Sequence, residues 1–210
     1  MSVIAIDSAS RARAWVLLTT HDGSVIEQRD LPGGELERIL PGLLAELLTS
    51  EVTAVVVLTG PGSYNGIRAG MAAALGVAAA RGLPLHGLGN LAGLASMADV
   101  ADGAEFSVVS DAGRGGVYVA RFTRRGPLLE QVSPVRRVTA REVDTRGPVL
   151  ATAEIAGLHT EQVHPVRVLA AAVPWALSQP ALAPLGLRAI HVESAGNGAR
   201  TAGEGTPKAL

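Results

Sequence analysis

The sequence predicts an α/β protein made of two related domains, each with a mixed sheet flanked by helices. Residues 3–7 and 105–110 are short apolar runs, each followed by an aspartate or ending in one, then by a turn and a second apolar run. Residues 52–59 form a valine-rich run, typical of a central strand covered on both faces. With 48% hydrophobic residues, a chain of 210 residues can bury the core of one ordinary domain or of two small ones.

The first domain is expected to open with three antiparallel strands and to continue with alternating helices and strands. Polar residues 21–24 separate the second and third apolar runs, as in a β-hairpin. Leu and Ile recur at helical spacing in residues 35–48, where Pro41 predicts a kink or a break. Gly82 and Pro84 stop the helix that follows the central strand. We expect strands at 3–7, 14–20, 25–30, 52–59 and 85–88, and helices at 35–48, 66–80 and 91–98.

The composition shifts at residues 99–104, where we place the boundary between a first domain, 1–98, and a smaller second domain, 99–167. A last helix at 168–177 is expected to return to the first domain. The tail, 194–210, is rich in Gly, Ala and Thr and is expected to be mobile. In the second domain we expect strands at 105–110, 117–123, 128–134 and 148–152, and a short helix at 139–143.

Charge and composition exclude several classes of protein. Eighteen basic and nineteen acidic residues give a net charge of −1, so the chain as a whole does not attract nucleic acid or anionic membranes. The absence of cysteine excludes disulfides and thiolate chemistry. The first residues lack the basic region and long apolar run of a signal peptide, and no stretch reaches the roughly 20 apolar residues that span a bilayer. We therefore expect a soluble cytoplasmic protein without a membrane partner.

A glycine-rich turn joins the valine-rich strand to the next helix. Such a turn leaves backbone N–H groups free at a helix N-terminus, where the helix dipole favours an anion. The candidate residues that face an anion or nucleotide are Asp7, Gly60, Gly62, Ser63 and Asp111. The alternative is that the two aspartates accept N–H bonds within their own turns and that the serine caps the helix.

The helix after this turn carries small residues at a spacing of four, so one broad face has almost no side chains. Glycine costs about 1 kcal/mol in a helix interior relative to alanine, and close packing would offset that cost. The face is therefore either packed inside the chain, on the sheet or the preceding helix, or is a subunit interface. The candidate interface residues are Gly66, Ala69, Gly70, Ala73, Ala74 and Val77.

The sequence predicts neither catalytic residues nor a metal site. The two nearest histidines, His159 and His164, are five apart, whereas two ligands on one helix face need a spacing of three or four. Ser63 lies outside a Gly-x-Ser-x-Gly pattern, and no His or Asp partner can be assigned to it. Arg68 is expected to bond carbonyl groups of the glycine turn or to meet an acidic partner.

Residues 60–70, Gly-Pro-Gly-Ser-Tyr-Asn-Gly-Ile-Arg-Ala-Gly, resemble the signature of the TsaB (YeaZ) family, Gly-Pro-Gly-Ser-Phe-Thr-Gly-x-Arg-x-Gly. Residues 82–95 and 111–122 are similar to the family in order and spacing, and the resemblance covers residues 1–123. It implies the actin-like ATPase (ASKHA, ribonuclease H-like) fold, whose nucleotide lies between two domains. Asp7 and Asp111 occupy the places of the aspartates that face phosphates and metal in that superfamily.

The resemblance also implies a function. TsaB proteins are non-catalytic subunits of the bacterial machinery that makes threonylcarbamoyladenosine (t6A) in tRNA. They bind and activate the catalytic subunit TsaD, and a TsaE ATPase joins the pair. The expected partners are therefore a TsaD-like subunit, a TsaE-like ATPase and, through the complex, tRNA; a homodimer is a further assembly. No cofactor is expected for this chain itself, although ATP or ADP can belong to the complex. The alternative is a glycoprotease-like peptidase or an actin-like nucleotide hydrolase that uses the two aspartates and the glycine turn.

Overall fold

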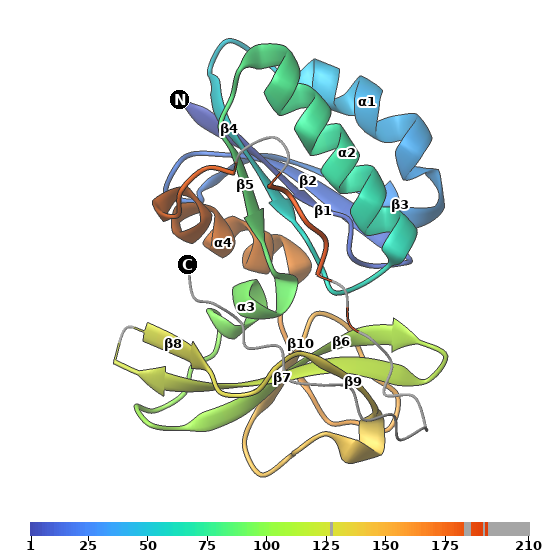
Figure 1. Cartoon of the computed structure of the whole chain (residues 1–210), viewed down its shortest axis with the longest axis vertical. Coiled ribbons are helices and arrows are strands. Elements are labelled where there is room, and N and C mark those ends of the chain that lie inside the picture. The colour runs from blue at the N-terminus through green and yellow to red at the C-terminus, as the bar shows by residue number, and fades with distance from the viewer. Residues whose placement is uncertain (127, 183–185, 191, 193–210) are drawn as a thin grey trace, which may run out of the picture.

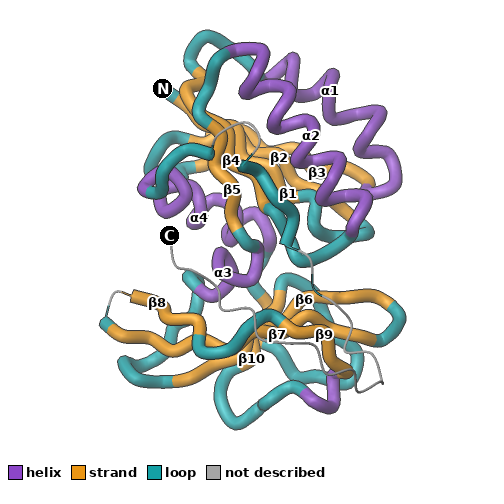
Figure 2. Tube along the Cα trace, viewed as in Figure 1, coloured by secondary structure: helices purple, strands orange, loops and turns teal. Residues whose placement is uncertain are grey.

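The first domain of this computed structural model is a five-stranded mixed sheet covered by helices on both faces (Figures 1 and 2). The structure describes residues 1–126, 128–182, 186–190 and 192, so the tail at 194–210 lies outside the described residues. The sheet order is β3-β2-β1-β4-β5, with β1 antiparallel to β2 and parallel to β4. The strands are β1 (Ser2–Asp7), β2 (Arg13–Thr19), β3 (Val25–Pro32), β4 (Val52–Leu58) and β5 (Leu85–Leu88).

Alternating residues of the central strands supply two separate cores. Ile4 and Ile6 of β1 face the helices α1 (Leu36–Leu47) and α2 (Tyr64–Arg81). Val3 and Ala5 face the opposite helix, α4 (Pro165–Ser178), which lies against the first sheet as Figure 1 shows. Pro41 lies inside α1, which continues past it, so the expected break is absent. Within the described ranges, no helix is long and apolar enough to cross a membrane.

The second domain repeats the central arrangement of the first. β6 is antiparallel to β7 and parallel to β10, as β1 is to β2 and β4. The helix α3 (Asn90–Ala95) lies between the two sheets and packs Leu91 and Leu94 against Phe106 and Leu150. The strands are β6 (Glu105–Gly113), β7 (Gly116–Arg125), β8 (Leu128–Gln131), β9 (Arg136–Thr139), β10 (Val149–Ala151) and β11 (Glu161–Gln162).

Two features of the second domain differ from the sequence-based expectation. The helix expected at 139–143 is a single 3-10 turn, Ala140–Glu142, which begins with a capping box of Thr139 and Glu142 and ends where the backbone becomes extended at Val143. The strands β9 and β11 were not predicted. They are short and largely exposed, and their polar residues carry no hydrophobic alternation that would mark a strand.

The turn between β1 and β2 lies directly against the glycine turn and the start of α2. A Cβ atom at Gly62 would lie 2.3 Å from the carbonyl oxygen of Ala9, and one at Gly66 would lie 2.3 Å from that of Ser8. Neither position can carry a side chain, because the atoms in the way belong to the backbone. The N–H of Ser63 donates to the Ala9 carbonyl at 2.7 Å. The glycines therefore hold α2 tightly against the end of β1.

This contact decides which face of α2 is free. Gly66, Gly70 and Ala74 are buried, and a Cβ at Gly70 would lie 2.1 Å from Oγ of Ser8. The expectation that these three residues face a partner is wrong, since the chain's own first strand and following turn cover them. The alternative, that this stripe packs inside the chain, is confirmed.

Two glycine substitutions on α2 test this packing. Gly66→Ala should lower the free energy of unfolding by about 2 kcal/mol, because the new methyl group overlaps a backbone carbonyl. Gly76→Ala is the matched control, since nothing lies within 4 Å of a Cβ there. It should raise stability by up to about 1 kcal/mol through helix propensity. Urea unfolding followed by circular dichroism measures both, and equal effects of the two changes would contradict the packing described.

Candidate functional site

The carboxyl ends of β1 and β6 meet at a pocket between the two domains. Asp7, Gly62 and Asp111 all line it, so the structure brings together three of the five residues predicted to face an anion. Gly60 and Ser63 belong to the same turn but do not line the pocket. Its volume is about 100 Å³. Sites for drug-sized ligands usually enclose roughly 300 Å³ or more, so a nucleotide requires the domains to move apart.

The two aspartates make the same local bond. Oδ1 of Asp7 accepts the N–H of Ala9 at 2.9 Å, and Oδ1 of Asp111 accepts the N–H of Gly113 at 2.8 Å. Each carboxylate thus closes the turn that follows the first strand of its domain. These bonds agree with the interpretation in which the aspartates support their own turns.

The glycine turn is occupied by groups of the chain itself. The Ser63 N–H, which an anion cradle would leave free, donates to Ala9. The Ser63 hydroxyl accepts the N–H of Gly66 at 3.4 Å and caps α2, as the sequence suggested. Asn90 holds the other side, donating from Nδ2 to the carbonyl of Pro61 at 2.7 Å. These bonds give the turn a structural role.

Two side chains at this site were not predicted. Arg11 follows β1 and lines the pocket. Its guanidinium packs closely against Gly113, since a Cβ atom added to Gly113 would lie 2.7 Å from Nη2 of Arg11. Asn90 begins α3 and lines the same pocket. Arg11 stands in no motif, and Asn90 lies within the family-like segment 82–95, where nothing marks it as a pocket residue. The residues that each contacts are distant in sequence, so the sequence alone does not show these contacts.

Asp7 is the one strongly perturbed acid of the pocket. Asp7 is 8% exposed, and this burial raises the pKa of its carboxyl group to about 6. The hydrogen bond from the Ala9 N–H lowers this pKa and so opposes part of the shift. The protonated form is therefore present at mildly acidic pH. This carboxylate is held in an unfavourable environment by the turn that it closes.

A second, larger depression is a groove between α1 and α2, with a volume of about 520 Å³. Three of the predicted interface residues, Ala69, Ala73 and Val77, line it. The groove exists because α2 presents only small side chains there. Apart from Glu37 its walls are apolar. They comprise Leu36, Glu37, Leu40, Pro41, Leu44, Ala45, Leu48, Ala69, Ala72, Ala73, Gly76, Val77 and Ala80.

The remaining candidates have structural surroundings. Arg68 lies over the ring of Tyr64, with its Cζ 5.2 Å from the ring centre, so the expected bonds to carbonyl groups of the turn are replaced by this stacking. Nδ1 of His164 accepts the N–H of Val166 at 3.3 Å and begins α4. Among the described residues, no three His, Asp or Glu side chains lie close enough to hold a metal ion.

Asp7→Asn should change the pH dependence of stability. The pKa of Asp7 is about 6 in the folded protein against an ordinary value of 3.8, so the folded state binds more protons between these values. The free energy of unfolding therefore falls as pH rises through this window, by at most about 3 kcal/mol. The asparagine variant can keep the bond to Ala9 and should lack this loss.

Urea unfolding at several pH values between about 4 and 7 checks this expectation. Asp111→Asn is the matched control, because it removes an exposed carboxylate that makes the same local bond. The control should keep the pH dependence of the wild type. Parallel curves for the wild type and Asp7→Asn would contradict the assigned burial effect.

Sequence comparisons relate the chain to proteins of tRNA modification. Residues 36–174 match the family model described as "TsaD: tRNA N6-adenosine threonylcarbamoyltransferase". An uncharacterized protein of Mycobacterium tuberculosis is 36% identical, with 89% of this chain and 92% of the relative covered. The tRNA threonylcarbamoyladenosine biosynthesis protein TsaB of Bacillus subtilis is 28% identical, with 79% and 76% covered. The protein of the same name from Escherichia coli is 34% identical, with 59% and 56% covered.

Solved structures agree on the fold. YeaZ from Pseudomonas aeruginosa is 19% identical and superimposes with a TM-score of 0.65, covering 91% of this chain and 99% of that protein. Its likeness, with the family match, confirms the predicted actin-like fold of two α/β domains. The chain therefore belongs to the TsaB (YeaZ) family, within the wider family that the TsaD model describes.

Proposed function

We propose that this chain is a non-catalytic subunit of a bacterial t6A complex and that it binds and activates a TsaD-like catalytic subunit. Its relatives in Bacillus subtilis and Escherichia coli are named as t6A biosynthesis proteins. The observation that carries the proposal is the contrast between the two depressions. The pocket between the domains is about 100 Å³, whereas the apolar groove between α1 and α2 is about 520 Å³.

The groove suits helices of another subunit. Leu36, Leu40 and Leu44 of α1 form one wall, while the small residues of α2 form the other. A knob of Leu or Ile size from a partner can enter such a groove because alanine and glycine leave room for it. Each square ångström of apolar surface removed from water contributes about 25 cal/mol, so the empty groove represents unused binding energy.

A TsaD-like protein is the partner that fits best. The TsaD family model matches this chain over residues 36–174, a range that includes both α1 and α2. A partner of related fold therefore carries equivalent helices. Two related surfaces can meet around a pseudo-twofold axis, in which each groove receives residues of the other subunit. In this complex the chain stabilises the catalytic subunit, a TsaE-like ATPase joins the pair, and tRNA is modified by the TsaD-like subunit. A second copy of the chain is the competing occupant.

The geometry gives the enzyme alternatives less support. A serine peptidase needs a free nucleophile, but the Ser63 hydroxyl accepts the N–H of Gly66 at the cap of α2. A nucleotide hydrolase needs an open cleft and free N–H donors, but the Ser63 N–H is bonded and the pocket is small. Asp7 and Asp111 both support turns.

A bulky charge in the groove should disrupt the complex. Ala73→Arg places a long cation among apolar walls, and binding to a purified TsaD-like protein from the same organism should weaken by roughly tenfold or more. Ala79→Arg is the control, because Ala79 is exposed on the same helix outside the groove. Titration calorimetry measures binding, and t6A content of tRNA measures modification with the TsaE-like ATPase and a source of threonylcarbamoyl-adenylate.

Three outcomes of this experiment separate the possibilities. Loss of binding and modification in Ala73→Arg but not in Ala79→Arg supports the proposal. Loss of a homodimer with unchanged TsaD-like binding would assign the groove to a second copy. Full modification in a mixture that lacks this chain would contradict the proposed function itself.

The isolated chain should show neither ATP hydrolysis nor a heat of binding with ATP and Mg²⁺. The reason is the small pocket, whose glycine turn already donates the Ser63 N–H to Ala9. Calorimetry and a phosphate-release assay check this expectation. Tight ATP binding that disappears in both Asp7→Ala and Asp111→Ala would instead favour the nucleotide hydrolase.

A further inference from the structure

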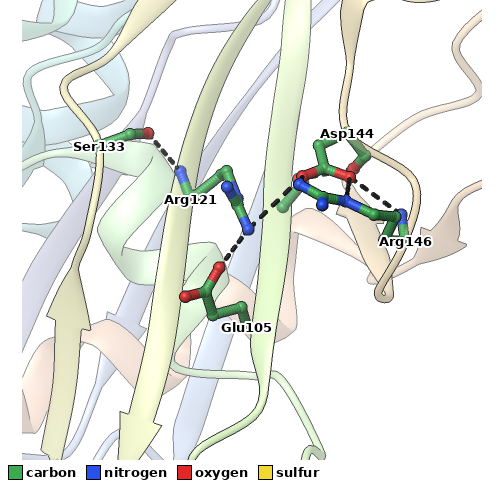
Figure 3. A network of polar contacts seen from close by, with 6 residues as sticks. Glu105, Arg121, Ser133, Asp144 and Arg146 are labelled. Carbon is green, nitrogen blue, oxygen red and sulfur yellow. Dashed lines mark hydrogen bonds and ion pairs between the residues drawn. The ribbon is translucent and has the colours of Figure 1, made fainter.

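Two arginines of the second domain are neutralised inside it, as Figure 3 shows. Arg121 lies between Glu105 and Asp144, and Arg146 donates to both carboxylate oxygens of Asp144 at 2.7 and 3.0 Å. These cations have acidic partners and offer little charge to another molecule.

A different set of arginines, Arg114 and Arg137 of the second domain and Arg11 of the first, gathers around the turn between β6 and β7. The Arg11 guanidinium lies against Gly113 and that of Arg137 against Gly116, where added Cβ atoms would be 2.7 and 2.6 Å from Nη2. Arg137 also donates to the Gly113 carbonyl at 2.9 Å. Among the residues that the structure describes, neither these two arginines nor Arg114 forms an ion pair.

Arg114 stands at the tip of this turn in an uncommon conformation. Its φ is 54°, between Gly113 at 69° and Gly115 at 71°. A residue with a side chain costs folding free energy in this region that a glycine would not. Arg114 is exposed, so its side chain does not contribute to the packing of the core. The turn therefore presents an exposed cation at a position where backbone geometry favours glycine.

Two tyrosines extend this cationic surface. Tyr118 lies directly opposite Arg137 in the pairing of β7 and β9, so both side chains are on one face of the sheet. Tyr118 and Tyr64 line the same small pocket. Tyr118 is half-buried and packs against the core cluster that contains Leu94 and Phe106, whereas Tyr64 is 61% exposed beneath Arg68. We call the whole the arginine–tyrosine surface, and it comprises Arg11, Tyr64, Arg68, Arg114, Tyr118 and Arg137.

We propose that the arginine–tyrosine surface binds RNA, with its guanidinium groups on phosphates and the exposed ring of Tyr64 beside an unpaired base. Guanidinium groups match phosphate oxygens in geometry and charge, and aromatic rings stack with bases exposed in RNA loops. Two carboxylates adjoin this surface, since Asp7 and Asp111 line one pocket with Arg11, and the Oδ1 of Asp111 accepts the N–H of Gly113. An acidic peptide would use the cations but not the rings. The identification of this RNA as tRNA rests on the proposed function.

The net charge of −1 does not oppose this inference. Opposite charges that are paired within the sheets cancel at a distance, whereas four arginines on one surface act locally. Such a surface binds weakly by itself and adds its contribution to that of the catalytic subunit. It would hold the tRNA while the TsaD-like subunit acts on it.

Salt-dependent binding of a dye-labelled, unmodified tRNA transcript to the full chain tests the inference. Fluorescence anisotropy is measured at salt concentrations from about 50 to 200 mM. Arg114→Gly suits the test because glycine favours the backbone of the turn, and Arg137→Ala removes a second cation. Each variant should bind roughly three- to tenfold more weakly, and the slope of log affinity against log salt should fall by about 0.7 to 0.9. Arg29→Ala is the charge-matched control on the distant strand β3, and it should bind like the wild type.

Several results would overturn the inference. The first is that the wild-type chain, at up to roughly 100 µM, does not bind the tRNA at about 50 mM salt. The second is that the arginine variants and the control bind with equal affinity. The third is that polyglutamate displaces the tRNA at equal charge concentration. Circular dichroism of each variant separates loss of contact from loss of folding, and Arg114→Lys should restore much of the binding. Unchanged tRNA KM in Arg114→Gly, in a complex that modifies tRNA, would contradict this inference alone. A wild-type chain that binds tRNA but never supports modification would contradict the proposed function alone.

Discussion

The structure depends on the contact between two backbone carbonyl groups and two glycines. The carbonyls of Ser8 and Ala9 approach Gly66 and Gly62 so closely that no side chain could be placed between them. This approach brings the start of α2 against the end of β1 and uses the Ser63 N–H as a donor. The direction of α2, the size of the pocket between the domains and the exposure of the groove all follow from it.

The same contact explains why a turn with the appearance of an anion site has a structural role. A phosphate cradle requires free N–H groups and space in front of the helix. In this chain the neighbouring turn supplies a carbonyl oxygen to that position, and Asn90 braces the opposite side. Asp7 then closes its own turn in a buried environment, which is why the pKa of its carboxyl group rises to about 6. An aspartate of each domain lines the pocket, but the volume of the pocket is small.

Two surfaces of the described residues suit interactions, and their chemistry differs. The groove between α1 and α2 is apolar and open, which suits helices of another protein. The arginine–tyrosine surface lies where the two domains meet and is cationic and aromatic, which suits a polyanion with exposed bases. A subunit with both can hold a protein partner and an RNA at once. That combination agrees with the proposed role in tRNA modification.

The sequence by itself determined the two-domain α/β architecture, because the strand, aspartate and turn recur and because periodicity marks α1, α2 and the buried β4. It also identified Ser63 as a helix cap and the family of the chain. Only the tertiary structure decided which stripe of α2 is free. Both stripes of this helix carry small residues, Gly66, Gly70 and Ala74 on one and Ala69 and Ala73 on the other. Small side chains allow another segment to approach closely, but their size does not say whether that segment belongs to the chain itself or to a partner. Only the tertiary structure, likewise, could bring Arg11 onto Gly113, since this contact joins residues of different domains through the packing of both.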